Sequence, residues 1–207
     1  SIELFSKNFF NKKIISFEAS PINFKYLKKK IEKNKQAYNN TEIILENIAL
    51  GAEGKITEFK QFEESSSSTI QKIDEESKYY KRKFRLINFL NNKKIYKIIQ
   101  IKISKLKDYV EKNNIKKIDF LKIDTEGYEF EILSGLENKI QLVDTVMFEH
   151  HYDNMIKKSY TFTDINELLI KNNFNKIYKS RMPFRKTFEY IYKRAEAINW
   201  KTLRHLY

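Results

Sequence analysis

The stretch from Ile118 to Gly135, IDFLKIDTEGYEFEILSG, places the strongest constraint on the fold of this chain. It opens with a short apolar run of β-branched and aromatic residues, which is typical of a strand covered on both faces. We predict that an amphipathic helix follows, with Glu129 and Glu131 on its wetter side. The apolar residues that recur at helical spacing are Tyr128, Ile132, Leu133 and Leu136.

A short acidic turn separates the predicted strand from the predicted helix, and it contains Asp124 and Glu126. In open α/β sheets, ligands bind at the carboxyl ends of the strands. These two carboxylates therefore occupy a position typical of functional residues. An ordinary strand-to-helix turn is the alternative, because acidic residues are favoured at the positive end of a helix dipole.

Composition narrows the class of protein. The chain has 207 residues, 41% hydrophobic and 14% aromatic, which is enough for one sizeable core and short of two ordinary domains. It has no cysteine, so disulfides and thiolate metal sites are excluded. No apolar run approaches the length of a membrane span, and no signal peptide opens the sequence. We expect a single cytoplasmic domain over residues 1–207.

The net charge of +13 would suit nucleic acid, an anionic membrane or an acidic substrate. The lysines are spread along the chain, however, which favours an ordinary solvated surface. Residues 61–94 form a charged insertion or loop in which Tyr79 and Tyr80 stand among Lys and Arg residues. These rings could stack on a single-stranded nucleic acid, or the segment could simply cover the core.

Strands and helices alternate along the chain. The predicted strands are 13–17, 41–50, 55–60, 95–103, 118–123, 143–148, 174–179 and 188–192. The predicted helices are 1–10, 21–34 after an N-cap at Ser20, 105–112 after Ser104, 164–172 after Thr163, and 194–207. This order favours an α/β fold with a doubly wound, mostly parallel sheet that ends in an antiparallel hairpin.

Polar residues stand at the ends of four predicted strands: Glu18, Asn47, Asp124 and the run Glu149–His151. In a doubly wound fold these ends face one crevice. An acidic residue at such a strand end can accept hydrogen bonds from the vicinal hydroxyls of a ribose. The pattern therefore suggests a cofactor that contains a nucleoside.

Five segments, in this order and spacing, carry a resemblance: FEASP (17–21), NIALG (47–51), the serine run 65–68, KIDTEGYEFEILSG (122–135) and FEHH (148–151). The chain resembles the FkbM-type family of methyltransferases, which depend on S-adenosylmethionine, over Ser1 to Tyr192. The resemblance implies a Rossmann-like class I fold and methyl transfer, typically to an oxygen of a sugar or another small acceptor.

The resemblance also implies residue roles. Glu18 would hold the cofactor ribose and Ala19 would border the adenine, with Asn47 and Ile48 along its edge. Asp124 and Glu126 would lie near the methionine end and the acceptor. The family's first strand and glycine-rich turn would precede the first residue, so we expect an N-terminally incomplete domain. The strands that end at residues 17 and 123 would then have open edges.

A hydroxyl acceptor needs a base or a metal for its proton. His150 is the first candidate base because imidazole titrates near neutrality, and Asp124 or Glu126 is the second. We do not favour a metal at Asp124, Glu126, His150 and His151, because adjacent histidines on a strand point to opposite faces. Two other functions stay open: a basic nucleic-acid-binding or RNA-modifying module, and an inactive remnant of the fold.

Overall fold

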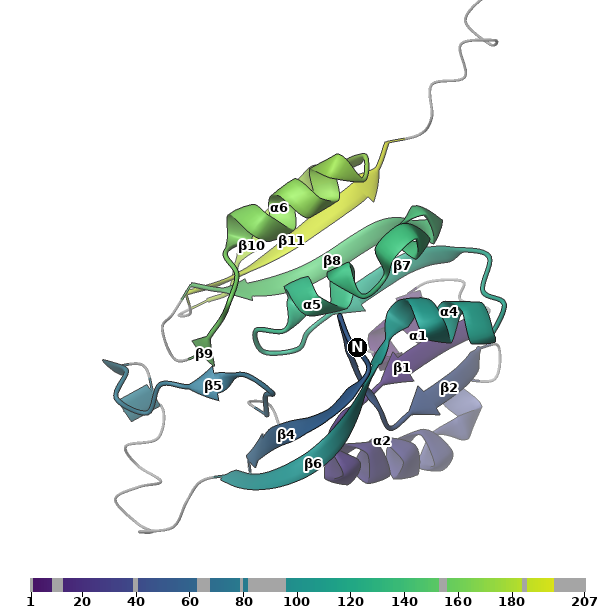
Figure 1. The fold of residues 1–207 in the computed structure, drawn as a ribbon. Helices are drawn as coiled ribbons and strands as arrows, with labels where there is room; N and C mark the ends of the chain where they lie inside the picture. Colours follow the sequence, from purple (N-terminus) through teal and green to yellow (C-terminus); the bar gives the residue numbers. More distant parts are fainter. Residues whose placement is uncertain are drawn as a thin grey trace, which may run out of the picture.

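A computed structural model describes residues 2–8, 13–38, 41–62, 68–78, 80–81, 96–152, 156–183 and 186–195 of the chain. Helices and strands both occur along these segments, and two strand pairs are parallel, so the predicted α/β class is confirmed (Figure 1). None of the described helices is long and apolar enough to cross a membrane.

The first half of the chain is rich in strands. Its elements are α1 (Ile2–Asn8), β1 (Lys13–Phe17), α2 (Pro21–Lys33), the 3-10 helix η1 (Lys35–Tyr38), β2 (Glu42–Glu46), β3 (Ala49–Gly51), β4 (Lys55–Phe62), β5 (Lys72–Ile73) and β6 (Tyr96–Lys105). The second half begins with a helix. Its elements are α4 (Leu106–Lys112), β7 (Ile118–Ile123), α5 (Glu129–Ser134), the 3-10 helix η3 (Glu137–Leu142), β8 (Val143–His151), β9 (Ile156–Lys157), α6 (Phe162–Lys171), β10 (Phe174–Arg181) and β11 (Thr187–Arg194).

The largest sheet has the order β10-β11-β8-β7. β7 and β8 are parallel, and β8, β11 and β10 are antiparallel neighbours, so the predicted C-terminal hairpin is confirmed. Helices α5 and α6 lie along this sheet (Figure 1). The buried side chains of Val146 and Phe148 on β8 form the main core with Leu133 on α5 and with Ile165 and Leu169 on α6.

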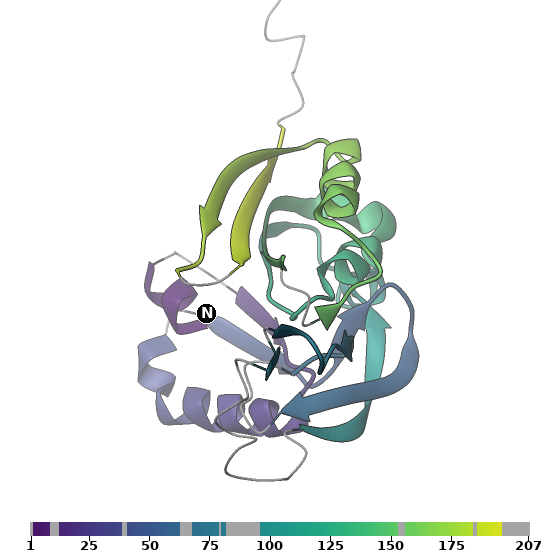
Figure 2. The same ribbon diagram turned by 90° about the vertical axis from the view of Figure 1, so that its left-hand side faces the viewer.

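β1 and β2 form a separate parallel pair, in register from Lys13 opposite Glu42 to Phe17 opposite Glu46. In the described part of the chain, β1 pairs only with β2 and β7 pairs only with β8, so the predicted parallel sheet is not continuous. Among the described residues, each of these two strands therefore has one edge without a strand partner. Figure 2 shows α2, beside β1 and β2, at the opposite end of the molecule from the β10–β11 hairpin.

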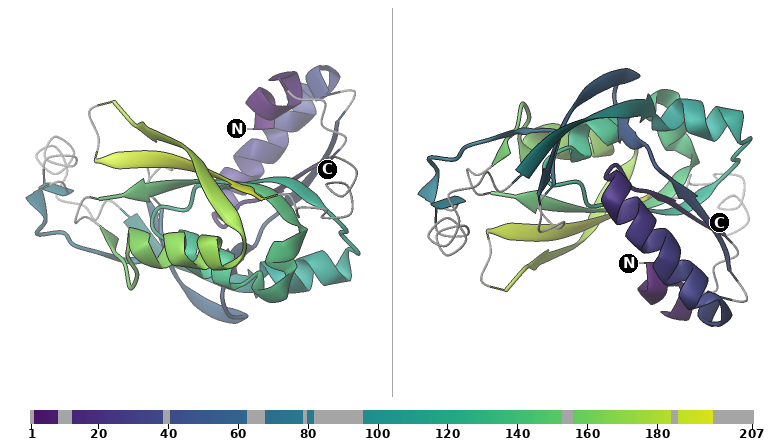
Figure 3. Two further views of the ribbon diagram at one scale, coloured as in Figure 1. Left: turned by 90° about the horizontal axis from the view of Figure 1, so that it is seen from above. Right: turned by 90° about the horizontal axis from the view of Figure 1, so that it is seen from below.

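Helix α1 joins these two parts of the molecule. Phe5 of α1 packs against Phe120 of β7, with ring centroids 5.2 Å apart. On its other side α1 lies beside α2, where Glu3 forms an ion pair with Lys30 at 3.6 Å (Figure 3). The predicted helix at the start of the chain is therefore confirmed, and it packs against β7 through Phe5.

The predicted strand 41–50 is wrong in one respect, because it divides at Asn47 and Ile48 into β2 and β3. Asn47 donates its side-chain amide to the backbone carbonyl of Glu18 at 2.8 Å, which fixes the chain beside the end of β1. β3 then leaves β2 and pairs with β6, with Ala49 opposite Ile103. A side-chain bond to the backbone has taken the place of one step of the strand ladder.

Helix starts are predicted correctly only in part. Ser20 is the N-cap of α2, and its hydroxyl accepts the amide N–H of Asn23 at 3.2 Å, as predicted. Ser104 is not a cap, because it lies in β6 and α4 begins after Lys105 without a side-chain cap. Thr161 caps α6 in place of Thr163, because only Thr161 forms the reciprocal capping box with the acid three residues later.

Several predictions fall outside the described residues. These are most of the serine run, most of the charged segment 61–94, including Tyr79, and most of the helix expected at 194–207. Arg194 itself is the last residue of β11. Tyr80 is only 6% exposed, so its ring is not presented on the surface for stacking on nucleic acid.

Candidate active site

Glu18 and Asn47 lie together where β1 and β2 end. The Glu18 amide N–H donates to the Glu46 carbonyl at 2.9 Å, which continues the pairing of the two strands. The Glu18 carboxylate accepts the Ser20 amide N–H at 2.9 Å. Burial raises the pKa of the Glu18 carboxyl, and the hydrogen bond from Ser20 opposes that shift. The acid is therefore held at the strand end and does not extend freely into solvent.

Apolar packing connects this end of β1 with the end of β7. Ala19, directly after β1, and Tyr128, directly before α5, pack against the same buried cluster, which includes Ala49 and Ile103. The approach is close, because a Cβ added at Gly51 would lie 2.9 Å from the Tyr128 ring. Ile48 is half-buried and packs instead against the main core. The carboxyl ends of β1, β2 and β7 therefore border one region.

The acidic turn after β7 is held from two directions. Glu126 and Gly127 have positive φ values of 49° and 92°, so the backbone turns sharply here. The Thr69 hydroxyl donates to the Glu126 backbone carbonyl at 2.9 Å, and the side-chain amide of Gln71 donates to the Gly127 backbone carbonyl at 3.0 Å. The residues directly after the serine run therefore fasten the turn.

The side chains of this turn point to different partners. Asp124 is exposed and forms an ion pair with Lys122 at 2.7 Å. It also lies near Glu149, whose carboxyl pKa is raised by burial first and by the Asp124 charge second. The Glu126 carboxylate is 3.4 Å from Nε2 of His151. The turn thus brings one carboxylate to each of two residues at the end of β8.

Glu129 was predicted on the wet side of its helix, and this is wrong: its exposure is 0%. Its carboxylate accepts the Gly127 amide N–H at 2.9 Å, the Thr125 hydroxyl at 3.3 Å and the Tyr160 hydroxyl. Tyr160 belongs to the segment between β9 and α6, which covers this face of α5. Helical periodicity identifies an outer face but cannot show that a distant segment lies on it.

Glu131 is also less exposed than the helical pattern suggests. Burial raises the pKa of its carboxyl, and Ser159 donates a hydrogen bond to it at 3.2 Å. The same covering segment is therefore responsible for both corrections on α5.

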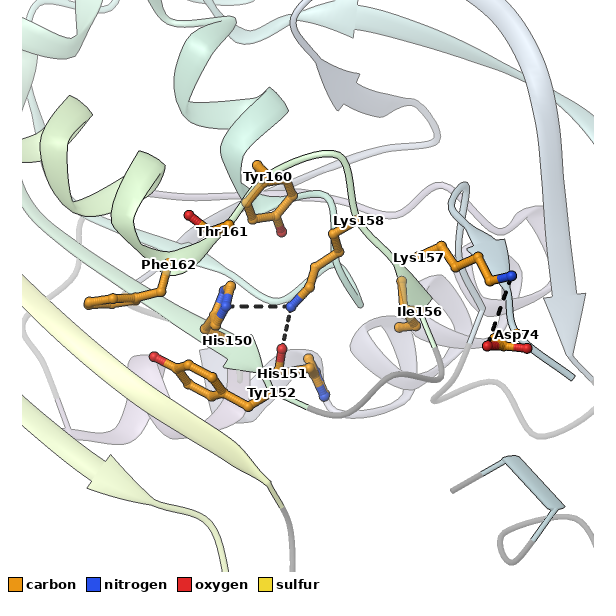
Figure 4. A pocket seen from close by; sticks show the side chains of 10 residues that line it. All are labelled: Asp74, His150, His151, Tyr152, Ile156, Lys157, Lys158, Tyr160, Thr161 and Phe162. Carbon is orange, nitrogen blue, oxygen red and sulfur yellow. Dashed lines mark hydrogen bonds and ion pairs between the residues drawn. The ribbon is translucent and has the colours of Figure 1, made fainter. Parts of the chain in front are cut away.

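A cavity of about 540 Å³ opens beside the end of β8 (Figure 4). Its walls come from β8, from the strand β9 and from the segment that leads into α6. The lining residues are Asp74, His150, His151, Tyr152, Ile156, Lys157, Lys158, Tyr160, Thr161 and Phe162. Histidines, lysines and aromatic rings therefore dominate its surface.

His150 lies in the wall of this cavity and is only 3% exposed. Burial lowers the pKa of its imidazole to about 3, and the nearby charges of Lys158 and His151 add to the shift. The Lys158 ammonium is 3.5 Å from Nε2 of His150. Because an ammonium group only donates, Nε2 is the acceptor and Nδ1 carries the ring proton. That Nδ1 is buried and has no hydrogen-bond partner among the described residues.

Aromatic rings surround His150. The ring of Tyr152 meets it edge-on at a centroid distance of 4.8 Å, and Phe162 does so at 5.8 Å. Tyr152 is 44% exposed, and its hydroxyl is hydrogen-bonded to that of Tyr190 at 2.7 Å. The cavity thus has aromatic rings at its rim beside a neutral imidazole.

His151 has different partners from its neighbour. Its Nδ1 is 3.0 Å from the Thr187 hydroxyl, on β11, and its Nε2 faces Glu126. In the part of the chain that the structure describes, no group of three or more His, Asp or Glu side chains is arranged to hold a metal ion.

The residues predicted from the sequence fall into two groups. Glu18, Ala19 and Asn47 lie together at the ends of β1 and β2, whereas Glu126 and His150 lie beside the cavity at the end of β8. Tyr128 lies between the groups, next to the turn that carries Asp124 and Glu126. The sequence missed three residues that shape the second group, namely Glu129, Lys158 and Tyr160.

Comparison with known families gives one match. A family model described as the methyltransferase FkbM domain matches residues 2–178. No curated protein and no solved structure gives a significant match to the chain. The matched range runs from α1 into β10 and contains the strand ends and the cavity described above.

Proposed function

The chain belongs to the FkbM methyltransferase family, and from this premise we propose that it transfers a methyl group from S-adenosylmethionine to an oxygen of a sugar or another small polar acceptor. The family match supports methyl transfer. The observation that carries the acceptor side is the cavity at the end of β8, with His150 in its wall. The proposal includes a Rossmann-like class I fold, supported by the parallel pairs β1–β2 and β7–β8.

The residues at the ends of β1 and β2 suit a nucleoside. A carboxylate such as that of Glu18 accepts hydrogen bonds from vicinal ribose hydroxyls. The apolar surfaces of Ala19 and Ile48 suit an adenine ring, and Asn47 holds the backbone of Glu18 in place. When bound, S-adenosylmethionine supplies the reactive methyl group on its sulfonium. The chain supplies alignment and a route for the acceptor proton.

The cavity suits a small polar acceptor. Its volume lies in the range of small-molecule sites, about 300–1,000 Å³. Tyr152 and Phe162 offer ring surface, and Thr161 and Lys158 offer polar groups, a combination that fits the two kinds of surface of a sugar. No described residue favours nucleic acid to the same degree, since Tyr80 is buried.

His150 stays our candidate base, although its imidazole does not titrate near neutrality as expected from the sequence. Its pKa of about 3 means that the ring is neutral throughout the neutral pH range but is a weak base, and its Nε2 can take the acceptor proton only in place of its contact with the Lys158 ammonium. If His150 is the base, the rate of methyl transfer should show no loss of activity as the pH falls from 7.5 to 6. A loss of activity as the pH falls over this range would instead assign the proton transfer to another group.

The experiment that tests the proposed function is methyl transfer from labelled S-adenosylmethionine to a panel of sugars and to RNA, together with calorimetric binding of the cofactor. Glu18→Ala should weaken cofactor binding by about tenfold, the loss expected for one charge-assisted hydrogen bond. Glu42→Ala is the matched control, because Glu42 is an exposed acid that pairs with Lys13 at 3.3 Å, at the opposite end of β1 and β2 from Glu18. Transfer to RNA and never to sugars would contradict the proposed acceptor class.

A further inference from the structure

Glu129 is the only carboxylate that is fully buried among the described residues. A buried carboxylate lowers stability unless hydrogen bonds compensate for its lost hydration. Here three donors converge on it: a backbone amide, a threonine hydroxyl and a tyrosine hydroxyl. Stability alone does not require a charge at this position, since a well-packed apolar side chain often serves a core equally well.

The three donors come from two separate parts of the chain. The Gly127 amide and the Thr125 hydroxyl belong to the acidic turn after β7. The Tyr160 hydroxyl belongs to the segment that enters α6 and forms part of the cavity wall. A single side chain therefore fastens the turn to the wall of the cavity.

The acidic turn and the Tyr160 wall, which Glu129 connects, each contact residues that we place in the site. On the turn, Glu126 follows directly after Thr125 and faces His151 at 3.4 Å. At the wall, the Tyr160 ring stacks on Phe130 at 5.5 Å and lies 5.8 Å from the Lys158 ammonium, which contacts His150. A shift of Glu129 would displace both sets of groups together.

We propose that Glu129 is a positioning residue of the transferase site, whose carboxylate holds the acidic turn and the Tyr160 wall of the cavity in one fixed arrangement. The inference rests on the proposed function, because it assigns the fixed arrangement a role in methyl transfer. Glu129 acts through the turn and through Tyr160 and does not itself touch the acceptor.

Two variants test the inference. Glu129→Leu removes all three hydrogen bonds and introduces no charge, and Tyr160→Phe removes one of them and keeps the ring that stacks on Phe130. The matched control is Tyr109→Phe, because the Tyr109 hydroxyl also donates to a glutamate, Glu46, at 3.0 Å, away from the cavity. Glu46 ends β2 beside Glu18, so any effect of this variant on the site should appear in the KM for S-adenosylmethionine and not in kcat. The readouts are hydrogen exchange at the Gly127 amide, the Tm, and kcat and KM with an acceptor found in the labelled-methyl screen.

We expect Gly127 exchange to accelerate by about tenfold or more in Glu129→Leu, because its amide loses its acceptor. We expect kcat to fall by about tenfold to a hundredfold in Glu129→Leu and several-fold in Tyr160→Phe, with less than about a threefold change in the KM for S-adenosylmethionine, since small displacements in a site affect turnover strongly. Tyr109→Phe should lower the Tm without a comparable loss of kcat.

Equal kcat values for Tyr160→Phe and Tyr109→Phe, measured well below both Tm values, would overturn the positioning role. If Glu129→Leu does not fold, Tyr160→Phe and its control decide the question alone. If the wild-type chain neither binds S-adenosylmethionine nor transfers methyl, the proposed function fails. Gly127 exchange then still decides whether Glu129 holds the turn, and unchanged exchange in both variants would overturn that as well.

Discussion

The proposed cofactor side of the site, at Glu18, Ala19, Asn47 and Ile48, differs in construction from the proposed acceptor side, at Glu129, His150, His151 and Tyr160. The cofactor side is held mainly by bonds to the backbone, with one further side-chain hydrogen bond between Glu18 and Asn23, and Asn47 is exposed. The four residues of the acceptor side are buried. Tyr160 is hydrogen-bonded to Glu129 and its ring lies 6.1 Å from that of His150, whereas the side chain of His151 contacts Thr187 and Glu126.

This difference predicts which effects substitutions should have on each side. A side chain held only by the backbone can be removed with little effect on the fold, so its loss should appear mainly in binding. A buried network couples stability, ionisation and geometry, so its disruption should appear in several measurements at once.

The largest effect should come from breaking the join between the two sides. α5, on the acceptor side, packs through Gly135 directly against Gly51 of β3, and a Cβ added at Gly135 would overlap the Gly51 carbonyl group. Gly135→Ala should therefore lower the free energy of unfolding by about 3 kcal/mol or more, as overpacking against rigid backbone does. Urea denaturation measures this loss.

The control for that substitution is Gly54→Ala. A Cβ at Gly54 would come no closer than 3.9 Å to the nearest atom, so its free energy of unfolding should change by less than about 0.5 kcal/mol. Similar losses for the two variants would show that α5 and β3 do not pack as closely as described.

The next effect concerns the pH dependence of stability on the acceptor side. The folded-state pKa of His150 lies at about 3, below its unfolded value, so the unfolded chain binds the proton first as the pH falls. The free energy of unfolding contributed by neutral His150 is complete above pH 6.5. It should fall by at most about 1.4 kcal/mol per pH unit below that value.

Urea denaturation at pH 7, 6 and 5 measures this slope, with His150→Phe for comparison. The variant has no imidazole at this position and should lose less stability between pH 7 and 5 than the wild-type chain. The same slope in both proteins would mean that His150 is not held neutral by burial.

The smallest effect sharpens the description of the cavity rim. Thr161 lines the cavity and caps α6. Its hydroxyl accepts the Asp164 amide N–H, and its own amide N–H donates to the Asp164 carboxylate. Thr161→Ala should cost about 1 kcal/mol in the free energy of unfolding, the usual loss for an N-cap. Thr163→Ala should cost less than about 0.5 kcal/mol, because Thr163 lies inside the helix. The reverse order in thermal denaturation would restore Thr163 as the cap.

Local patterns in the sequence predicted most strands well. Lys13–Phe17 has the same bounds in the structure, and the Ser20–Pro21 helix start is confirmed. The start of α6 could also have been predicted from the sequence, since Thr161 is followed three residues later by Asp164. The division of the strand at Asn47 could not have been predicted, because it depends on a hydrogen bond from the Asn47 side chain to the end of a different strand.

The candidate site shows the same limit. The resemblance identified Glu18 and Asn47, and the structure places these two in contact. It did not identify Glu129 or Tyr160, because each is buried by the other's segment, and the two positions are 31 residues apart in the sequence. Their residue types and spacing carry no signal until the fold brings the segments together.

The central claim is that the two sides form one site, with S-adenosylmethionine bound at one side and a small acceptor at the other. The most direct measurement is steady-state methyl transfer by Glu18→Ala and Tyr152→Ala, with each substrate varied in turn. We predict that Glu18→Ala raises the KM for S-adenosylmethionine alone and that Tyr152→Ala raises the KM for the acceptor alone. An unchanged KM for S-adenosylmethionine in Glu18→Ala, or a raised one in Tyr152→Ala, would contradict the account.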